Sequence, residues 1–332
     1  MTPVINEPKR ALIFGIGGQD GAYLARLLLD KGTAVHGTSR DIEVAGFDGL
    51  KQLGLFGRVR LHSANLGDFR SVAQVLRQVE PDEVYNLAAQ SSVGLSFEQP
   101  IETANSIINA TLNVLEAIRF LGGKPRFYNA SSSEMFGDTG AAAADELTPF
   151  RPASPYGVSK AAAHWMVASY RRAYGLYACS GILFNHESPL RRERFVTQKI
   201  VRAAVDIHLG AARRLTLGNI AVTRDFGYAP DYVEAMWLML QQQEADDFVI
   251  ATGKPATLQD FVAAAFGRLK LDWTAHVDID KGLMRPYEVD RTVGNPAKAA
   301  QMLNWRARTA MPELVAKLVD AELERRGNKG AA

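Results

Sequence analysis

Short apolar runs alternate with longer amphipathic segments through the first half of the chain. The runs at residues 10–14, 34–38, 83–88 and 126–131 have the length and the apolar character of buried strands. The segments at residues 22–31 and 106–120 repeat apolar residues at helical spacing, and Leu24, Leu27 and Leu28 share one face of the first segment. Strands that alternate with helices in this way predict an α/β fold, in which helices cover a doubly wound parallel sheet.

The second half of the chain continues this pattern and then loses it. A helical pattern at residues 156–174 precedes a strand-like run at residues 178–184, and only shorter helices are predicted beyond, at residues 231–242 and 258–269. No linker rich in Pro, Gly and Ser separates two modules. We therefore expect a first domain at residues 8–185 and a smaller, interleaved C-terminal lobe at residues 186–327, from which residues 220–255 return to the first domain.

Composition and charge argue against several classes of protein. Of the 332 residues, 47% are apolar and 22% are charged, and the net charge of +2 lacks the basic excess of a nucleic-acid-binding protein. The single cysteine, Cys179, argues against a disulfide framework and against a cysteine metal cluster. The first ten residues lack the apolar stretch typical of a secretory signal, so we expect none, and the sequence has no run of roughly 18 apolar residues. We expect a cytoplasmic protein whose partners include neither nucleic acid nor a membrane.

Glycines recur where the first predicted strand meets the first predicted helix. In the segment FGIGGQDG, Gly15, Gly18 and Gly21 allow a tight turn and a close approach of the backbone to a pyrophosphate. The N–H groups at the N-terminus of the helix can bind the charge of that pyrophosphate. A plain tight turn is the alternative interpretation. The order strand, turn, helix favours a dinucleotide-binding turn, and with it a Rossmann-like fold.

The end of the second predicted strand bears on the choice of dinucleotide. An acidic residue at this place binds a ribose 2′-hydroxyl, whereas an arginine favours a 2′-phosphate. Here Arg40 and Asp41 are adjacent, and Arg40 comes first. We therefore expect NADP as the cofactor, with NAD as the alternative.

A tyrosine and a lysine lie one turn apart at the start of the helix predicted at residues 156–174. Tyr156 and Lys160 lie on one face of that helix, so both side chains can meet the same ligand. A nearby ammonium favours the phenolate, so we expect the pKa of Tyr156 to lie below its ordinary value near 10, where it can exchange a proton with a sugar hydroxyl. A chance surface pair is the alternative, and the glycine turn argues against it.

Hydroxyl and carboxyl side chains end the strand predicted at residues 126–131. The carboxyl edge of a parallel sheet faces the ligand, and Ser132 and Glu134 follow that edge. An enzyme that oxidises and reduces one carbon needs only the tyrosine, whereas removal of a C–H proton at another carbon needs a second base. Glu134 is our candidate for that base, and a solvated loop glutamate is the alternative.

Two further features receive a plain interpretation. His186 is one of six histidines, but they form no metal-ligand spacing, so we expect no metal site. Arg191, Arg192 and Arg194 form a basic cluster, either on a solvated loop or at a cofactor or subunit boundary.

Taken together, these motifs resemble the extended short-chain dehydrogenase/reductase family. The resemblance covers nearly the whole chain and includes the stretches GQDGAYL, EVYNLAAQSSV, FYNASSSEMFG, SPYGVSKAAAHW and GILFNHESPLR. It implies a Rossmann domain that binds NADP and a lobe that binds a nucleotide sugar, GDP-mannose. It further implies a dehydratase in which hydride passes from the sugar C4 to the cofactor and back to C6, and a homo-oligomer, dimer or tetramer.

The resemblance also implies roles for individual residues. Ser132 matches the residue that hydrogen-bonds the sugar C4 oxygen, Glu134 the acid/base, Tyr156 the tyrosine base and Lys160 its partner. The implied cofactor contacts, besides Tyr156 and Lys160, are Gly15, Gly18, Gln19, Asp20, Gly21, Arg40, Asn65, Leu66 and Ala88. The implied substrate contacts are Ser91, Asn185, Lys199, Arg224, Arg285 and Glu288.

The chain departs from the family pattern at several positions. Gly17 replaces a threonine of the glycine turn, Asp41 follows Arg40 where the family has a second arginine, and Asn65 replaces an aspartate near the adenine. The alternatives are another nucleotide-sugar dehydratase, a C4 epimerase, a reductase, or a non-catalytic cofactor-sensing protein. Glu134 argues against the epimerase, and the presence of both Tyr156 and Lys160 argues against the sensor.

Overall fold

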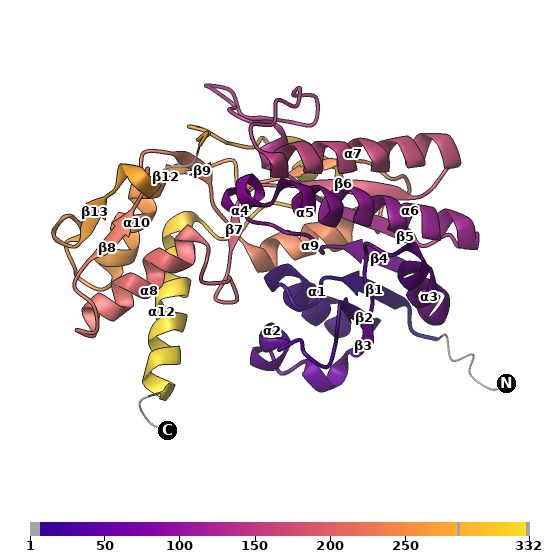
Figure 1. Cartoon of the computed structure of the whole chain (residues 1–332), viewed down its shortest axis with the longest axis horizontal. Coiled ribbons are helices and arrows are strands. Elements are labelled where there is room, and N and C mark those ends of the chain that lie inside the picture. The colour runs from indigo at the N-terminus through magenta and orange to yellow at the C-terminus, as the bar shows by residue number, and fades with distance from the viewer. Residues whose placement is uncertain (1–6, 284–285, 330–332) are drawn as a thin grey trace.

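A parallel sheet forms the centre of the protein. The computed structural model describes residues 7–283 and 286–329, and within them the central sheet has seven strands, all parallel to their neighbours (Figure 1). Their order across the sheet is β11 (Phe248–Ile250), β6 (Ala178–Leu183), β5 (Arg126–Ser132), β4 (Glu83–Asn86), β1 (Arg10–Phe14), β2 (Ala34–Ser39) and β3 (Arg60–Ser63). The strand order reverses between β1 and β4, which is where a doubly wound sheet forms its ligand crevice.

Helices cover both faces of this sheet. One face carries α1 (Gln19–Asp30), α2 (Asp48–Gln52), α9 (Ala229–Met239) and α11 (Ala297–Met302), and the other carries α3 (Phe69–Val79), α4 (Val93–Glu98), α5 (Pro100–Ala104), α6 (Ala110–Leu121) and α7 (Pro155–Tyr174). Successive strand residues point to opposite faces, so Ile13 packs toward α1 whereas Leu12 packs toward α3 and α6. The expected doubly wound α/β fold is confirmed.

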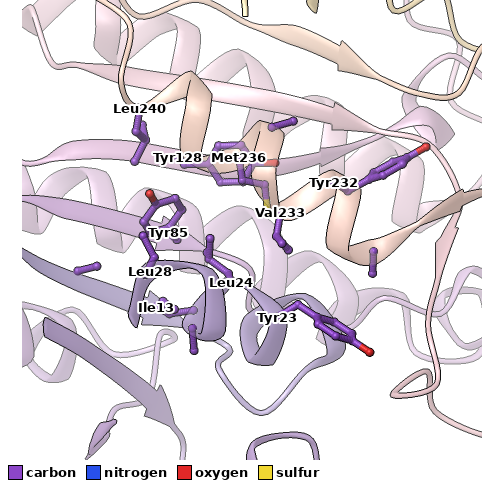
Figure 2. Close-up of a cluster of buried hydrophobic side chains, with 14 of the residues drawn as sticks. Ile13, Tyr23, Leu24, Leu28, Tyr85, Tyr128, Tyr232, Val233, Met236 and Leu240 are labelled. Carbon is purple, nitrogen blue, oxygen red and sulfur yellow. The ribbon is translucent and has the colours of Figure 1, made fainter. Parts of the chain in front are cut away.

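The α1–α9 face holds a large apolar core. Figure 2 shows Leu24 and Leu28 of α1 facing Val233 and Met236 of α9, beside Tyr85 of the sheet. All of these side chains are buried, which explains the leucine face of the first predicted helix. This packing holds α1 against α9 and the sheet.

A second apolar core lies in the C-terminal lobe. It is formed by α8 (Val196–His208), α10 (Leu258–Arg268) and α12 (Met311–Lys329), beside the parallel pair β8 (Leu215–Leu217) and β13 (Val277–Ile279). Two further pairs, β7 (His186–Glu187) with β10 (Gly227–Tyr228) and β9 (Thr223–Asp225) with β12 (Pro255–Thr257), connect this core to the sheet. Between these pairs the chain returns to the sheet as α9 and β11, so the two parts are interleaved (Figure 1).

Candidate active site

The glycine turn joins β1 to α1 at the crevice of the sheet. Gly15 has φ +86°, and a Cβ on it would lie 2.8 Å from the backbone nitrogen of Ala88. A Cβ on Gly21 would lie 2.5 Å from the carbonyl oxygen of Gly15. Both positions therefore require glycine. A Cβ on Gly17, in contrast, would make ordinary contact with the ring of Phe47 at 3.7 Å, so a side chain fits there.

The N-terminus of α1 offers backbone donors beside this turn. Gly18 is the N-cap residue and provides no side-chain cap, so the first N–H groups of α1 are not capped by the residue that precedes them. Such a turn, with N–H groups at a helix N-terminus and no Cβ in the way, fits the pyrophosphate of a dinucleotide. The residues present therefore fit the expected cofactor.

The side chains of Gln19 and Asp20 bind another part of the protein. Gln19 Nε2 donates to the carbonyl oxygen of His186 at 3.0 Å, and Ser188 Oγ donates to Gln19 Oε1 at 2.7 Å. Asp20 Oδ2 lies 3.0 Å from His186 Nε2. With both side chains engaged in this way, these two residues have their backbone N–H groups to offer a cofactor.

The residues expected near the adenine and its ribose follow β2 and β3. Arg40 is exposed at the end of β2, and Asp41 Oδ1 accepts a hydrogen bond from the backbone N–H of Glu43 at 2.9 Å. Asn65 Oδ1 likewise accepts from the N–H of Gly67 at 3.0 Å. Asn113 Nδ2 donates to the carbonyl oxygen of Leu66 at 2.7 Å. The carboxylate of Asp41 and the amide oxygen of Asn65 therefore stabilise their own turns.

The tyrosine and the lysine lie in the first turns of α7. This helix begins at Pro155, and the Ser154 hydroxyl caps it by accepting from the N–H of Gly157 at 3.0 Å. Lys160 Nζ donates to the carbonyl oxygen of Ala130 at 2.7 Å and lies 5.8 Å from the centroid of the Tyr156 ring. Tyr156 and Lys160 are both buried, each 8% exposed.

Glu134 reaches the same place from the end of β5. It lies in the short 3₁₀ turn Ser133–Met135, and its N–H donates to Ser132 Oγ at 3.3 Å. A Cβ on Gly157 would lie 2.5 Å from the carbonyl oxygen of Glu134. Because position 157 is glycine, the first turn of α7 approaches the backbone of Glu134 directly. This close approach brings Ser132, Glu134, Tyr156 and Lys160 together, half-buried or buried, at the carboxyl edge of the sheet.

Burial dominates the protonation of this group. It raises the pKa of Tyr156 to about 12; a hydrogen bond with Ser132 lowers that pKa and the charge of Glu134 raises it. Burial lowers the pKa of Lys160 to about 8, against the opposing effect of Asp20. The expectation that Lys160 pulls the pKa of Tyr156 below 10 is therefore wrong for the protein alone, because the cost of burying a phenolate outweighs the favourable charges.

The substrate contacts expected in the lobe fall into separate places. Arg224 is buried, donates to the carbonyl oxygen of Thr223 at 2.9 Å, and pairs with Glu288 at 3.3 Å. Lys199 is exposed and donates to the carbonyl oxygen of Thr216 at 2.8 Å. Asn185 is half-buried, and its carbonyl oxygen accepts from the N–H of Gly227 at 2.8 Å. Ser91 is exposed ahead of α4, and Arg285 lies outside the described residues.

Two negative findings apply to residues 7–283 and 286–329. No group of three or more His, Cys, Asp or Glu side chains there is arranged to hold a metal ion. In the same residues, no helix combines the length and the apolar character needed to cross a membrane.

Sequence reasoning missed the contribution of His186 and Ser188. They are buried and bind the first turn of α1, although His186 and Asp20 are 166 positions apart. The adjacency of polar residues in the stretches QDG and NHES is the signal that the sequence offered.

Comparison with known proteins identifies the family. The family model for GDP-mannose 4,6 dehydratase matches residues 12–318. GDP-mannose 4,6 dehydratase 1 of Arabidopsis thaliana is 47% identical over 97% of this chain and 91% of its own length, and GDP-mannose 4,6-dehydratase of Sinorhizobium fredii is 42% identical over 96% and 98%. The structure of a Thermus thermophilus UDP-glucose 4-epimerase in complex with NAD superimposes with a TM-score of 0.83 at 25% identity, over 94% of this chain and 98% of that one. The chain therefore belongs to the GDP-mannose 4,6-dehydratase family.

Proposed function

We propose that this protein removes water from GDP-mannose and forms GDP-4-keto-6-deoxymannose. Membership of the family supports this substrate and this reaction. The observation that carries the proposal within the structure is the position of Glu134, whose charge acts on buried Tyr156. A C4 epimerase has no use for a second acid/base, whereas a dehydratase needs one at C5 and C6.

In this proposal Tyr156 accepts the proton of the C4 hydroxyl when C4 is oxidised to a ketone. Ser132 orients the C4 oxygen and hydrogen-bonds the phenol, which favours the phenolate. Lys160, held by the carbonyl oxygen of Ala130, adds a positive charge near the Tyr156 ring. When bound, a nicotinamide cofactor supplies a hydride acceptor for C4, a hydride donor for C6 and, in its oxidised form, a positive charge that also favours the phenolate.

Glu134 carries the protons of the elimination. The ketone at C4 makes the C5 proton acidic, and the Glu134 carboxylate removes it. The same group then protonates the C6 hydroxyl, which leaves as water while the C5–C6 double bond forms. C6 is then reduced, and C5 takes up a proton from solvent. Tyr156 returns the proton of the C4 hydroxyl to solvent, so the protons balance. C4 is oxidised and C6 is reduced by the same amount, so no external reductant is consumed.

We propose NADP rather than NAD as the cofactor. Arg40 is exposed at the end of β2, where a 2′-phosphate would lie, and an arginine pairs well with a phosphate. The Asp41 carboxylate, which would favour NAD, accepts a hydrogen bond from Glu43 within its own turn. Tighter binding of NAD than of NADP in calorimetry would overturn this assignment.

The remaining proposals concern the lobe, the assembly and the location. Buried Arg224 and half-buried Glu288 form a pair that suits the diphosphate and ribose of GDP-mannose. Val158 and Trp165 are 52% and 58% exposed on α7, and a second copy of the chain is the partner that we propose for this apolar surface. We also propose a cytoplasmic location, which rests on the single cysteine of the sequence.

One experiment tests the main proposal. Purified protein is incubated with GDP-mannose and a catalytic amount of NADP, and the nucleotide sugar is followed by mass spectrometry. We expect the loss of one water per sugar over many turnovers without added reductant. Unchanged GDP-mannose, or reduced cofactor that accumulates in proportion to product, would contradict the proposal.

A further inference from the structure

An extended segment near the end of the chain connects the lobe to the loop that follows Glu134. We call this segment, residues 288–295, the strap. It runs between β9 and the loop at residues 136–154, which joins the turn that carries Glu134 to α7. Parallel bridges join the strap to Thr223 of β9 on one side and to Ala144 of the loop on the other. The strap therefore contacts both parts at once.

On the side of the lobe, the strap holds the arginine of the expected substrate site. The carbonyl oxygen of Asp290 accepts from the backbone N–H of Thr223 at 2.8 Å and from Arg224 Nη1 at 3.4 Å. Arg224 Nη2 donates to Glu288 Oε1, in the first residue of the strap, at 3.3 Å. Buried Arg224 is therefore bound to the strap through the carbonyl group of Asp290 and the carboxylate of Glu288.

On the side of the loop, Asp138 binds the same part of the strap. Its Oδ2 accepts from the N–H groups of Asp290 at 3.2 Å and Arg291 at 3.4 Å, and its Oδ1 accepts from the N–H of Gly140 at 2.7 Å. The N–H of Thr139 donates to the carbonyl oxygen of Arg291 at 2.9 Å. A carboxylate is a stronger acceptor than a neutral group, so Asp138 ties the strap firmly to the loop.

The chain between Glu134 and Asp138 is closely packed. The first two residues after Glu134 are buried. Gly137 follows them with φ +68°, and a Cβ on it would clash with the carbonyl oxygen of Arg151. Glu134 and Asp138 therefore keep a fixed spacing.

These contacts form a continuous path from the proposed acid/base to the proposed substrate site. The path leads along the chain from Glu134 to Asp138, and then by hydrogen bonds through the backbone of Asp290 to Arg224. In the proposed function, Arg224 binds the nucleotide part of GDP-mannose and Glu134 acts on C5 and C6 of the sugar. A substrate anchored at one end reacts at the other only when the two sites are fixed relative to each other.

We propose that Asp138 is a positioning residue that fixes Arg224 relative to Glu134 through the strap, so that a bound nucleoside diphosphate places its sugar against the acid/base. This inference rests on the proposed function, because it takes Arg224 to bind the substrate. The role belongs to an exposed aspartate that acts through hydrogen bonds to the backbone.

The test compares the purified full chain with its Asp138→Ala variant in GDP binding, NADPH binding and turnover of GDP-mannose. The variant loses the carboxylate that binds the strap, and we expect GDP to bind about fivefold more weakly in calorimetry. The value of kcat should fall at least about tenfold, because the sugar is held less precisely. NADPH should bind as it does to the wild type, because the glycine turn is untouched. An unchanged GDP affinity, an unchanged kcat or an equal loss of NADPH affinity would each overturn the proposal.

Asp145→Ala serves as the matched control. Asp145 lies in the same loop, and its Oδ1 accepts from the N–H of Leu147 at 3.0 Å and from Thr148 Oγ1 at 3.0 Å. These bonds stay within the loop, so we expect the control to bind GDP and to turn over GDP-mannose as the wild type does. Equal losses in the Asp145→Ala and Asp138→Ala variants would overturn the proposal, since they would reflect a general loosening of the loop.

A conservative variant separates hydrogen bonding from other effects of the substitution. Asp138→Asn keeps a side-chain oxygen that can accept from the N–H groups of the strap. We expect its GDP affinity to return to within about twofold of the wild type. An Asp138→Asn variant that binds GDP as weakly as Asp138→Ala would overturn the role of these hydrogen bonds.

Hydrogen exchange of the wild-type chain tests the path without any substitution. Binding of GDP should slow the exchange of the backbone N–H groups of Asp290 and Arg291, and also that of Thr139 in the loop. Unchanged exchange at Thr139 would overturn the proposal. Failure of the proposed function is distinguishable, because a wild type that binds GDP but leaves GDP-mannose intact would refute the dehydratase and leave the binding comparisons valid.

Discussion

Replacement of Gly157 by alanine tests whether the close approach of α7 to Glu134 sets the geometry of the site. The added Cβ would lie 2.5 Å from the carbonyl oxygen of Glu134 and 3.2 Å from the Cβ of Pro152. Real Cβ contacts are rarely shorter than 3.4 Å, so the two backbones must separate by about 0.9 Å. That shift moves Glu134 away from Tyr156.

The expected effects on stability and on activity differ in size. Overpacking of this kind costs about 1–3 kcal/mol, and alanine gains about 1 kcal/mol over glycine inside a helix, so the free energy of unfolding should fall by at most about 2 kcal/mol. A misplacement near 1 Å lowers turnover by roughly 100-fold. The variant should therefore remain folded, bind NADPH and dehydrate GDP-mannose very slowly.

The assay measures urea unfolding, NADPH affinity and dehydration rate on the same preparation. Gly267→Ala is the matched control, because Gly267 also lies in a helix, α10, and an added Cβ would meet nothing within 4 Å. We expect that control to gain up to about 1 kcal/mol in stability and to keep its turnover. A Gly157→Ala variant with turnover within threefold of the wild type would refute the argument.

Three further predictions concern the chemistry of the site. Tyr156→Phe should lower turnover, measured by steady-state kinetics, by roughly 100-fold or more. The NADPH affinity, measured by calorimetry, should change little. Near-normal turnover would show that Tyr156 is not the base. The Glu134→Gln variant should still reduce bound cofactor, seen as a single burst of absorbance, but should release little dehydrated product. The wild type in heavy water should form a product with deuterium at C5. A wild-type product without deuterium at C5 would exclude Glu134 as the base that removes the C5 proton. Lys160→Met should abolish turnover yet raise the free energy of unfolding at pH 7 by up to roughly 3 kcal/mol, because burial lowers the pKa of Lys160 from 10.5 to about 8. In the wild type this burial cost is present below pH 8 and fades as the pH rises toward 10.5, so the gain of the variant in urea unfolding should shrink over that window; a constant gain would contradict the assignment.

Local patterns predicted most of the Rossmann part. The strand expected at residues 10–14 coincides with β1, and the helix expected at residues 156–174 matches α7 to within one residue. The helix expected to begin at Ala22 begins earlier, at Gln19, because the glycine turn leads directly into it. Apolar periodicity identifies the buried stripe of a helix. It does not detect a first turn made of polar residues, such as Gln19 and Asp20, so the helix start is predicted too late.

The sequence predicts which residues form the site, but not the pKa of its tyrosine. Ser132, Glu134, Tyr156 and Lys160 lie together as expected, and their catalytic roles stay predictions. The pKa of Tyr156 could not be predicted, because sequence spacing shows the neighbouring ammonium but not the depth of burial. The division of the chain at residues 185 and 186 also stays a prediction.

The long-range contacts of His186 could not be predicted from the sequence. Its partners Asp20 and Tyr232 come from α1 and α9, which meet at β7 only in the folded chain. The polar residues of the stretches QDG and NHES are the signal that the sequence offers, but nothing in either stretch shows that the two meet.

Backbone contacts, rather than side chains, set the geometry of this site. Gly15, Gly21 and Gly157 each lie so close to a neighbouring main chain that a Cβ would come within 2.8 Å of a backbone atom. The positions where the chain departs from its family do not lie at such close approaches. Gly17 faces the Phe47 ring with room for a side chain, and the side chain of Asn65 accepts a hydrogen bond within its own turn. Substitution at such positions leaves the main-chain approaches unchanged, so the arrangement of Tyr156 and Glu134 is compatible with those departures. We therefore expect glycines at close approaches to be the least replaceable residues of the site, ahead of many side chains that contact a ligand.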